Sequence, residues 1–375
     1  MKKKFISITN MAAPYQVKFC YDMQNYYDTE FWFYTKREKN RPKWWEISLG
    51  DKCKIMKWSF RLPIIGYVSL SLPLMLIKKK PDLILLGGFM KYHVFILFIA
   101  KLIGIKVAIY TEAVRKTKSD EDSTRVLMTS RNSKLKLIFA NILFKNADLF
   151  IGMGEVAKDQ LINEFKFKSS KVYKLIYPQD LANYFAHPLR IKQKHDKIIL
   201  LFANRLVDRY NPIFALQVLK RLNEKFDNIE LLINSEGPLK EKCSDYIKKN
   251  DLKNASFLND ISNWNDLHII YKSSDILFLP AEYSNGNGSI IEACASGMGI
   301  VVSDQIHNVS KHLIDNVNCY ICPLEIDKFV ESISKYINNT ELLKMHGQRS
   351  KILVEDRKNE YSANLYYTVL ENMFK

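Results

Sequence analysis

A short segment in the last third of the chain carries the residue types best suited to binding chemistry. It covers Ala281–Gly297 and runs AEYSNGNGSIIEACASG. Gly286 and Gly288 let the backbone come close to a ligand, because glycine has no Cβ. The apolar pattern from Ser289 onward predicts a helix, whose first N–H groups and positive dipole end would point at one spot. Glu292 lies in its first turn, where a carboxylate can hold hydroxyl groups beside a bound phosphate. The segment therefore predicts an anion site.

An arginine elsewhere in the chain adds a cation suited to phosphate. Arg205 follows Lys197–Ala203, which predicts a strand, and the segment above follows Asp275–Pro280, which predicts another. In a parallel sheet both strands end at the same edge, where ligands bind. A guanidinium matches phosphate oxygens and offsets the negative charge that grows on a leaving diphosphate.

Both residues also have simpler interpretations. Ser289 and Glu292 match a capping box, in which Ser289 is the N-cap of the helix and Glu292 reaches back to its N–H group. Arg205 would then be an ordinary surface residue. We favour the binding interpretation, because the two residues follow predicted strands at one edge of the same predicted sheet.

The order of strands and helices indicates two Rossmann-like domains. Strand-like and helical segments alternate before residue 179 and again after residue 196, which predicts parallel sheets. Residues 179–196 are polar and irregular, so we expect a linker there. The expected N-terminal domain covers 1–178 and the expected C-terminal domain covers 197–355, with a last helix over 356–375 that packs back on the first domain. The expected fold is α/β, with two parallel sheets that face each other across a cleft.

Two helices are expected at particular places within this pattern. Ile64–Ile77 predicts a buried or interfacial helix that ends in three lysines, and flanking lysines of this kind are typical of segments that lie on anionic bilayers. Pro212–Phe226 predicts a helix with Asn211 as its N-cap and a proline at its first position.

The positive charge of the chain is concentrated in its first half. Residues 1–190 contain 33 Lys and Arg against 16 Asp and Glu, whereas residues 191–375 contain 23 against 24. The excess favours an anionic partner for the first half, such as a lipid surface or a diphosphate-linked acceptor. We do not expect nucleic acid as that partner, because the basic residues interleave with predicted strands and match no reader motif.

The apolar runs of the chain are too short for a membrane-spanning helix. Leu62–Ile77 is broken by two prolines and a glycine, and Val94–Ile105 is broken by a lysine, whereas a spanning helix needs about 20 apolar residues. The first residues lack the long apolar stretch of a signal peptide. The six cysteines are scattered, which suits a reducing compartment. We therefore expect a cytoplasmic protein that is peripheral to the inner face of the plasma membrane.

Five segments in a fixed order carry a resemblance to a known family. They are Phe202–Leu206 with Asn211–Pro212, Ile233–Leu239, Asn254–Leu258, Asp275–Gly297 and Gly299–Asp304. Together they resemble the retaining glycosyltransferases of family 4 (group 1), which have the two-Rossmann GT-B fold. The resemblance is specific over residues 197–325 and only topological before them. It implies that the C-terminal domain binds a nucleotide sugar and the N-terminal domain binds the acceptor.

The resemblance implies roles for individual residues. Glu292 matches the second glutamate of the family's E-x7-E motif, which binds the donor ribose, and Arg205 matches the arginine that binds the diphosphate. The other implied donor-side residues are Gly237, Glu282, Ser284, Asn285, Gly286, Asn287, Gly288, Ser289 and Ile290. The last three would offer backbone N–H groups to the phosphates. Enzymes of this kind resemble metal-independent catalysts, so we expect a UDP- or GDP-linked donor, no metal and no other cofactor.

Two positions depart from the family pattern. The first glutamate of E-x7-E would fall at Ser284, and Glu282 is the nearby candidate to replace it. The family's lysine would fall at Tyr210, and Arg209 is the expected substitute in the catalytic set with Arg205. These departures affect the recognition of the donor sugar more than that of the nucleotide.

On the acceptor side the sequence offers a few candidates in the first half. Pro14 and Tyr15 follow the first predicted strand, and Glu112 follows a later one. His93 is the only histidine of the expected N-terminal domain, residues 1–178. His93 and Glu112 also have structural alternatives, as a core histidine and as an acid at a helix start. Asp120–Asp122 is a D-x-D, the metal motif of another glycosyltransferase fold, but it lies in a polar stretch that predicts a solvated loop.

The resemblance implies transfer of a sugar from a nucleotide sugar to a saccharide or lipid-linked saccharide, with retention, as in surface polysaccharide biosynthesis. One alternative is a nucleotide-sugar-binding protein with weak or no catalysis, which Ser284 and Tyr210 favour. Another is a nucleotide-sugar epimerase of GT-B type or a Rossmann oxidoreductase. No G-x-G-x-x-G motif follows the first predicted strand, which argues against a dinucleotide enzyme.

Overall fold

The computed structural model describes residues 1–38, 43–45, 48–63, 65–113, 133–193, 195–233, 237–258, 263–284, 287–306, 311–357 and 359–375. These residues divide into two units. Unit 1 contains Met1–Lys39, Trp45–Asp180 and Asn359–Lys375, and unit 2 contains Asn40–Trp44 and Leu181–Lys358.

Unit 1 is built on a seven-stranded parallel sheet in the order β3-β2-β1-β6-β7-β8-β9. Its strands are β1 (Lys4–Met11), β2 (Asp28–Thr35), β3 (Cys53–Ile55), β6 (Leu83–Gly87), β7 (Lys106–Thr111), β8 (Leu149–Met153) and β9 (Val172–Leu175). β6 and β8 are buried along almost their whole length. Continuous apolar strands of this kind are typical of a parallel sheet with helices on both faces.

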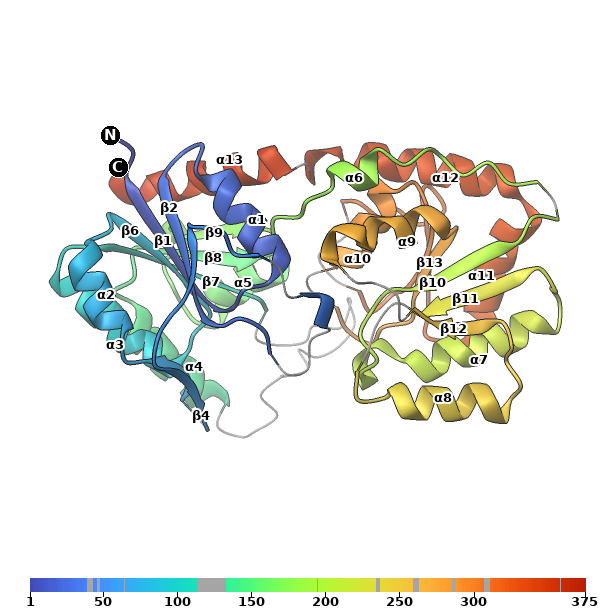
Figure 1. The fold of residues 1–375 in the computed structure, drawn as a ribbon, viewed down its shortest axis with the longest axis horizontal. Coiled ribbons are helices and arrows are strands. Elements are labelled where there is room, and N and C mark those ends of the chain that lie inside the picture. Colours follow the sequence, from blue (N-terminus) through green and yellow to red (C-terminus); the bar gives the residue numbers. More distant parts are fainter. Residues whose placement is uncertain are drawn as a thin grey trace. The chain divides into compact units, whose positions relative to one another are not determined.

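Helices cover the two faces of this sheet and close two cores (Figure 1). One core contains residues of α2 (Leu72–Lys79), α3 (Lys91–Leu102), α4 (Ser133–Phe144) and α5 (Glu155–Asn163), and the other contains residues of α1 (Pro14–Met23) and α13 (Asn359–Glu371). Alternation along β1 sends Ile6 and Ile8 to the first core and Phe5 to the second. The α13 residue Glu371 accepts hydrogen bonds from Lys3 at 2.5 Å and from Tyr27 at 2.9 Å, which tie the chain end to unit 1.

β4 (Ser59–Leu62) and β5 (Gly66–Ser69) form an antiparallel hairpin, so the helix predicted over Ile64–Ile77 is wrong where it covers β5. α2 begins only at Leu72. The physical reason is Gly66, whose φ of +90° is incompatible with a helix. A proline in the first turn of α2 is tolerated, because its missing N–H would have no partner within the helix.

Unit 2 is built on a six-stranded parallel sheet in the order β12-β11-β10-β13-β14-β15. Its strands are β10 (Ile198–Phe202), β11 (Ile229–Ile233), β12 (Ala255–Phe257), β13 (Ile276–Leu279), β14 (Gly299–Ser303) and β15 (Tyr320–Cys322). Numbered within the unit, this is the Rossmann order 3-2-1-4-5-6. The strand order reverses between β10 and β13, and folds of this type bind ligands beyond the carboxyl ends of those two strands.

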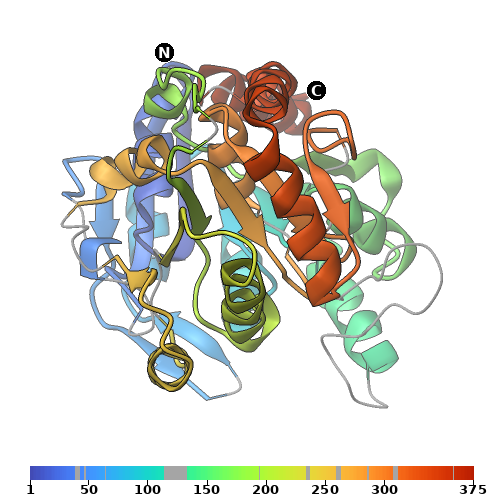
Figure 2. The same ribbon diagram turned by 90° about the vertical axis from the view of Figure 1, so that its right-hand side faces the viewer.

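The helices of unit 2 are α6 (Ala182–Phe185), α7 (Pro212–Asn223), α8 (Lys240–Lys249), α9 (Leu267–Ser273), α10 (Gly288–Ala295), α11 (Ile326–Asn338) and α12 (Thr340–Leu353). Figure 2 shows α7 and α11 side by side over one face of the sheet. Asn211 precedes α7 as predicted, but its side chain does not cap the helix. Its amide instead donates to the carbonyl of Pro280 at 3.0 Å. Within the described ranges, every helix is too short or too polar to cross a bilayer.

Candidate functional site

Loops that follow β10 and β13 are joined at the carboxyl edge of the unit 2 sheet. The Ser289 hydroxyl of α10 donates to Asn204 Oδ1, just after β10, at 2.9 Å. The backbone N–H of Glu282, after β13, donates to the carbonyl of Arg209 at 2.8 Å. These two bonds span the point where the strand order reverses, so the predicted ligand segment and the predicted arginines belong to one constellation of loops.

The loop after β11 reaches the same constellation through Gly237. The backbone N–H of Leu239 donates to the carbonyl of Leu206 at 3.0 Å. A Cβ atom on Gly237 would lie 2.5 Å from that carbonyl oxygen, closer than a side chain allows. Glycine at this position therefore sets the distance between two of the loops.

α10 begins at Gly288, one residue before the predicted start. Asn287 is its N-cap, with a left-handed φ of +49° and no capping hydrogen bond from its side chain. Of the three N–H groups that we expected to face a phosphate, that of Ile290 donates to the Asn287 carbonyl at 3.1 Å. The positive end of the helix dipole and the residues Gly288 and Ser289 lie at the ligand edge of the sheet.

Glu292 is buried within α10, with 9% of the residue exposed. Burial raises the pKa of its carboxyl group to about 7, and a hydrogen bond with Tyr271 of α9 opposes that shift. The alternative interpretation of Ser289 and Glu292 as a capping box does not hold, because Asn287 is the N-cap and Ser289 already lies inside the helix. A carboxyl group with a strongly perturbed pKa at the ligand edge of a parallel sheet is typical of a functional site.

Two arginines come from the loop after β10. Arg205 is half-buried just beyond the strand, and Arg209 belongs to the short 3-10 helix η3 (Asp208–Tyr210). The Arg209 guanidinium lies 4.6 Å from the centre of the Tyr210 ring and donates to its hydroxyl at 2.9 Å. Tyr210, which stands where the family has a lysine, is 8% exposed and packs in the core. It supplies no positive charge itself, and its ring and hydroxyl hold the guanidinium of Arg209 in place. Two guanidinium groups on one short loop suit a diphosphate.

The loop after β13 places its two candidate acceptors differently. Ser284 is 1% exposed and forms a bridge with Ile306, so a ligand does not reach it in this geometry. Glu282 is exposed, and its backbone is held by Arg209. Asn285 and Gly286 lie outside the described residues. Glu282 is therefore the better placed replacement for the first glutamate of the motif.

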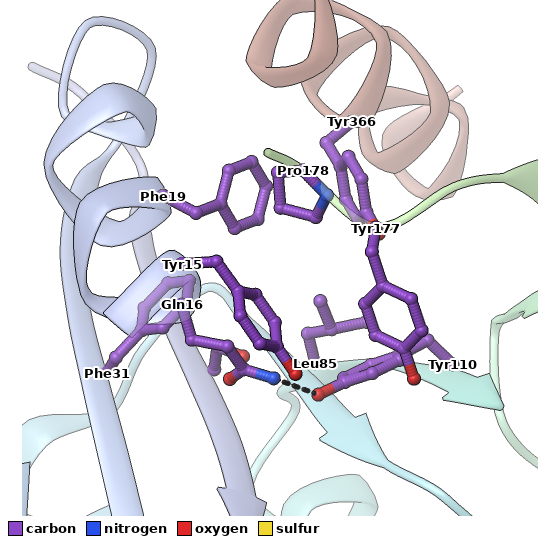
Figure 3. Close-up of a pocket in the computed structure, with 10 residues that line it drawn as sticks. Tyr15, Gln16, Phe19, Phe31, Leu85, Tyr110, Tyr177, Pro178 and Tyr366 are labelled. Atoms are coloured by element: carbon purple, nitrogen blue, oxygen red, sulfur yellow. Dashed lines mark hydrogen bonds between the residues drawn. The ribbon is translucent and has the colours of Figure 1, made fainter. Parts of the chain in front are cut away.

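In unit 1, Pro14 is the first residue of α1, and Tyr15 lines a pocket beneath that helix (Figure 3). Gln16 also lines it and donates to the Tyr110 hydroxyl at 3.2 Å. The rings of Tyr15 and Tyr177 meet edge to face, with centroids 5.9 Å apart. The other lining residues are Ser7, Phe19, Phe31, Leu85, Pro178 and Tyr366. The pocket is thus mainly aromatic, and its volume of about 20 Å³ is enough for one water molecule.

Glu112 and His93, the other acceptor-side candidates, have different surroundings. Glu112 is exposed beyond β7 and accepts a hydrogen bond from the Tyr177 hydroxyl at 2.9 Å, beside the pocket. His93 is fully buried in α3, and its ring nitrogens contact the Gly88 carbonyl at 3.0 Å and the Tyr34 hydroxyl at 3.2 Å. Burial lowers the pKa of His93 to about 4. These contacts use both ring nitrogens, so His93 has none left for an acceptor.

Some partners of the site residues were not predicted from the sequence. Asn204 lies next to Arg205 in the segment that carries the resemblance, so its place in the motif was a usable signal. No sequence pattern identified Tyr271 as a partner of Glu292, because nothing in the sequence shows that α9 packs against α10. Among the described residues, no three His, Cys, Asp or Glu side chains lie close enough to hold one metal ion. The D-x-D at Asp120–Asp122 lies outside those residues.

Residues 187–352 match the family described as Glycosyl transferases group 1. An uncharacterised glycosyltransferase of Haemophilus influenzae is 26% identical over 192 residues, which cover 51% of this chain and 52% of that protein. The chain spans about half the length of the first curated relatives that it matches.

Solved structures match the whole fold. Anabaena Alr3699/HepE in complex with UDP and glucose aligns over 100% of both chains with a TM-score of 0.72 and 13% identity. The lipopolysaccharide outer core galactosyltransferase WaaB aligns over 98% of this chain and 99% of its own with a TM-score of 0.66 and 14% identity. At such low identity these matches establish the fold alone, which is the GT-B fold with its two Rossmann-like domains.

Proposed function

Because this chain belongs to the group 1 glycosyltransferases of GT-B fold, we propose that it transfers a sugar from a nucleotide-sugar donor to a saccharide or lipid-linked saccharide, with retention. The observation that carries the proposal is the joining of the arginine loop to the start of α10 through Ser289 and Asn204. It brings cations, a helix N-terminus and Glu292 to the strand-order reversal of one Rossmann-like sheet.

The donor would lie along these loops of unit 2. Glu292 would accept hydrogen bonds from the ribose hydroxyls, and Arg205 and Arg209 would bind the diphosphate. Gly288 and Ser289 would face the phosphates, where the dipole of α10 favours negative charge. Glu282 would contact the sugar. A UDP-linked donor is the first choice, supported by the neighbour of the same fold that holds UDP and glucose.

The chemistry assigned to this chain is stabilisation of the leaving group. As the bond from the anomeric carbon to the diphosphate breaks, negative charge grows on the departing oxygen. Arg205 and Arg209 offset that charge, which lowers the barrier without a protein nucleophile. With retention, the acceptor hydroxyl bonds to the anomeric carbon on the face that the diphosphate leaves, and its proton passes to the departing phosphate. Because the arginines supply the positive charge, we propose no metal and expect transfer to persist in EDTA.

On unit 1, we propose that the acceptor lies at the carboxyl edge of the sheet, beside Tyr15 and the hydrogen-bonded pair of Tyr177 and Glu112. The pocket beneath α1 has room for about one water molecule, so it would not enclose a sugar. A role in surface polysaccharide biosynthesis is supported by the neighbour named as a lipopolysaccharide galactosyltransferase. A lipid-linked acceptor would also place this enzyme at the cytoplasmic face of a membrane.

A second candidate is a nucleotide-sugar-binding protein with little or no catalysis. It is favoured by the burial of Ser284 and Tyr210, the two positions where the motif departs from the family. In that case the donor nucleotide would bind, but the sugar would not be transferred.

The proposal is tested in two steps. A thermal-shift screen of UDP-, GDP- and ADP-sugars is expected to give stabilisation by one nucleotide, and release of the nucleoside diphosphate from that donor is then measured with saccharide acceptors. Glu292→Ala should weaken both readouts, whereas Glu241→Ala on the exposed face of α8 should change neither. Binding without any sugar transfer or hydrolysis would support the second candidate, and stabilisation by none of the donors would refute both.

A further inference from the structure

One side of unit 1 exposes an unusual amount of apolar surface. Of the 24 large apolar side chains that are exposed in the described part of the chain, 14 lie between residues 58 and 143. We call these 14 side chains the apolar face. They are Trp58, Phe60, Leu62, Ile65 and Leu70 around the hairpin, Leu74 and Ile77 of α2, Phe95, Phe98 and Leu102 of α3, and Ile138, Phe139, Ile142 and Leu143 of α4. Such a set is far larger than the scattered apolar residues of an ordinary surface.

The elements that carry these residues lie next to one another. Phe95, Phe98 and Leu102 recur at the spacing of one helix face, and Phe98 and Leu102 are 61% and 69% exposed. α2 and α4 both pack against α3, and so does strand β5 of the hairpin. Figure 1 shows the three helices and β4 on the same side of the unit 1 sheet.

The core of unit 1 does not account for this surface. The same helices fill the core with other residues, such as Leu76, Ile96 and Leu137, which are buried. A surface helix usually carries apolar residues on the core side and polar residues on the opposite side. In α3 and α4 apolar residues occupy both the side that faces the core and the side that faces away from it. The outward side is therefore suited to contact with an apolar partner outside the protein core.

The charge around the apolar face indicates what kind of partner it contacts. Residues 57–80, 91–102 and 133–146 contain ten Lys and Arg and not one Asp or Glu. Lys78 and Lys80 at the end of α2 are exposed. Lys79 and Lys101 are in part neutralised, by Glu30 at 2.7 Å and Asp148 at 2.8 Å. Lysine is depleted in protein–protein interfaces, whereas lysines that flank Phe, Leu and Trp are typical of helices that lie on anionic bilayers.

We propose that the apolar face docks unit 1 on an anionic lipid bilayer, with its side chains in the headgroup and upper acyl region and the lysines at the phosphates. The inference rests on the membrane partner named with the proposed function and assigns the surface that would make the contact. It requires no sugar transfer, so each proposal can fail without the other.

The test is co-sedimentation of the full chain with vesicles of phosphatidylcholine alone and with 30% phosphatidylglycerol. We expect binding to the anionic vesicles and not to the neutral ones. Phe95→Ser/Phe98→Ser should abolish it, whereas Ile269→Ser/Ile352→Ser, which removes two exposed apolar residues of unit 2, should not. Lys78→Gln/Lys80→Gln should weaken it about fivefold per lysine, and Lys248→Gln/Lys249→Gln on α8 is the matched control.

Light scattering and a thermal melt accompany each variant. Unchanged melting temperatures and unchanged stabilisation by UDP would show that the variants are folded and that the donor site is intact. Three results would overturn the proposal: no binding to anionic vesicles, equal binding of wild type and Phe95→Ser/Phe98→Ser, or a dimer in solution that this double variant dissociates. The last result would assign the apolar face to a second copy of the chain.

Discussion

The replacement Glu292→Gln probes the burial of the central carboxyl group. Burial raises the pKa of Glu292 to about 7, from an ordinary value of 4.5. Between these two pH values the folded protein holds a proton that the unfolded chain releases, so the free energy of unfolding falls as pH rises from about 4.5 to about 7. A shift of this size corresponds to about 3 kcal/mol between pH 4.5 and pH 8, and glutamine removes the titration while keeping the shape of the side chain.

The assay is urea unfolding of wild type and Glu292→Gln at several pH values without ligand. The two proteins should have similar stability at pH 4.5, and the variant should be the more stable by up to about 3 kcal/mol at pH 8. Glu241→Gln, an exposed replacement on α8, controls for the loss of one carboxylate elsewhere in unit 2. If Glu292→Gln and wild type keep the same difference in stability at every pH, Glu292 is not a buried carboxyl group that titrates near neutrality, and our interpretation of α10 is refuted.

Three further predictions concern the loops and the pocket. Arg205→Ala should lower the affinity for UDP by about ten- to a hundredfold, because a charge-assisted hydrogen bond contributes about 1.5–3 kcal/mol. Arg205→Lys should recover only part of it by titration calorimetry, since lysine lacks the planar fork; equal affinities would exclude contact with the diphosphate. Gly237→Ala should destabilise unit 2 by about 1–3 kcal/mol in urea unfolding, because its Cβ would collide with the Leu206 carbonyl. Tyr177→Phe should raise the KM for the acceptor about fivefold through the lost bond to Glu112, with donor hydrolysis unchanged; a change in donor hydrolysis alone would contradict the acceptor assignment.

Most of the architecture could be predicted from the periodicity of the sequence and from the family resemblance. The errors lie in short segments whose structure depends on local backbone conformation. The alternation of strands and helices predicted the α/β class, and the family resemblance implied the GT-B fold; the matches to solved structures confirm both. The second strand of the hairpin, β5 (Gly66–Ser69), fell within the helix predicted over Ile64–Ile77, because apolar composition alone does not show that Gly66 adopts a positive φ. Helix α5 (Glu155–Asn163) was not predicted at all; it is short, and its apolar residues are few.

The candidate site was predicted residue by residue only where a motif is local. Glu292 and Arg205 stand out through their place after predicted strands. The contact of Glu292 with Tyr271 joins two helices and needs the packing of the sheet, which no single segment encodes. The start of α10 was misplaced by one residue, since Ser289 is a good N-cap by type while its hydroxyl is used by Asn204. Part of the apolar face was predicted, because Ile64–Ile77 was interpreted as a buried or interfacial segment. Its residues in α3 and α4 were not, since apolar positions in a helix predict burial and only the fold shows which of them have no partner in the core.

The central claim is that a nucleotide sugar bound by unit 2 loses its sugar to an acceptor. NMR spectroscopy of the sugar and phosphorus signals of a UDP-sugar mixed with the full chain and a saccharide acceptor tests it most directly, with the UDP-linked sugar chosen by the thermal-shift screen. We predict the appearance of free UDP and of a new glycosidic signal with the anomeric configuration of the donor, both lost with Glu292→Ala. A donor that stays unchanged, or whose sugar is epimerised while UDP stays attached, would contradict the account.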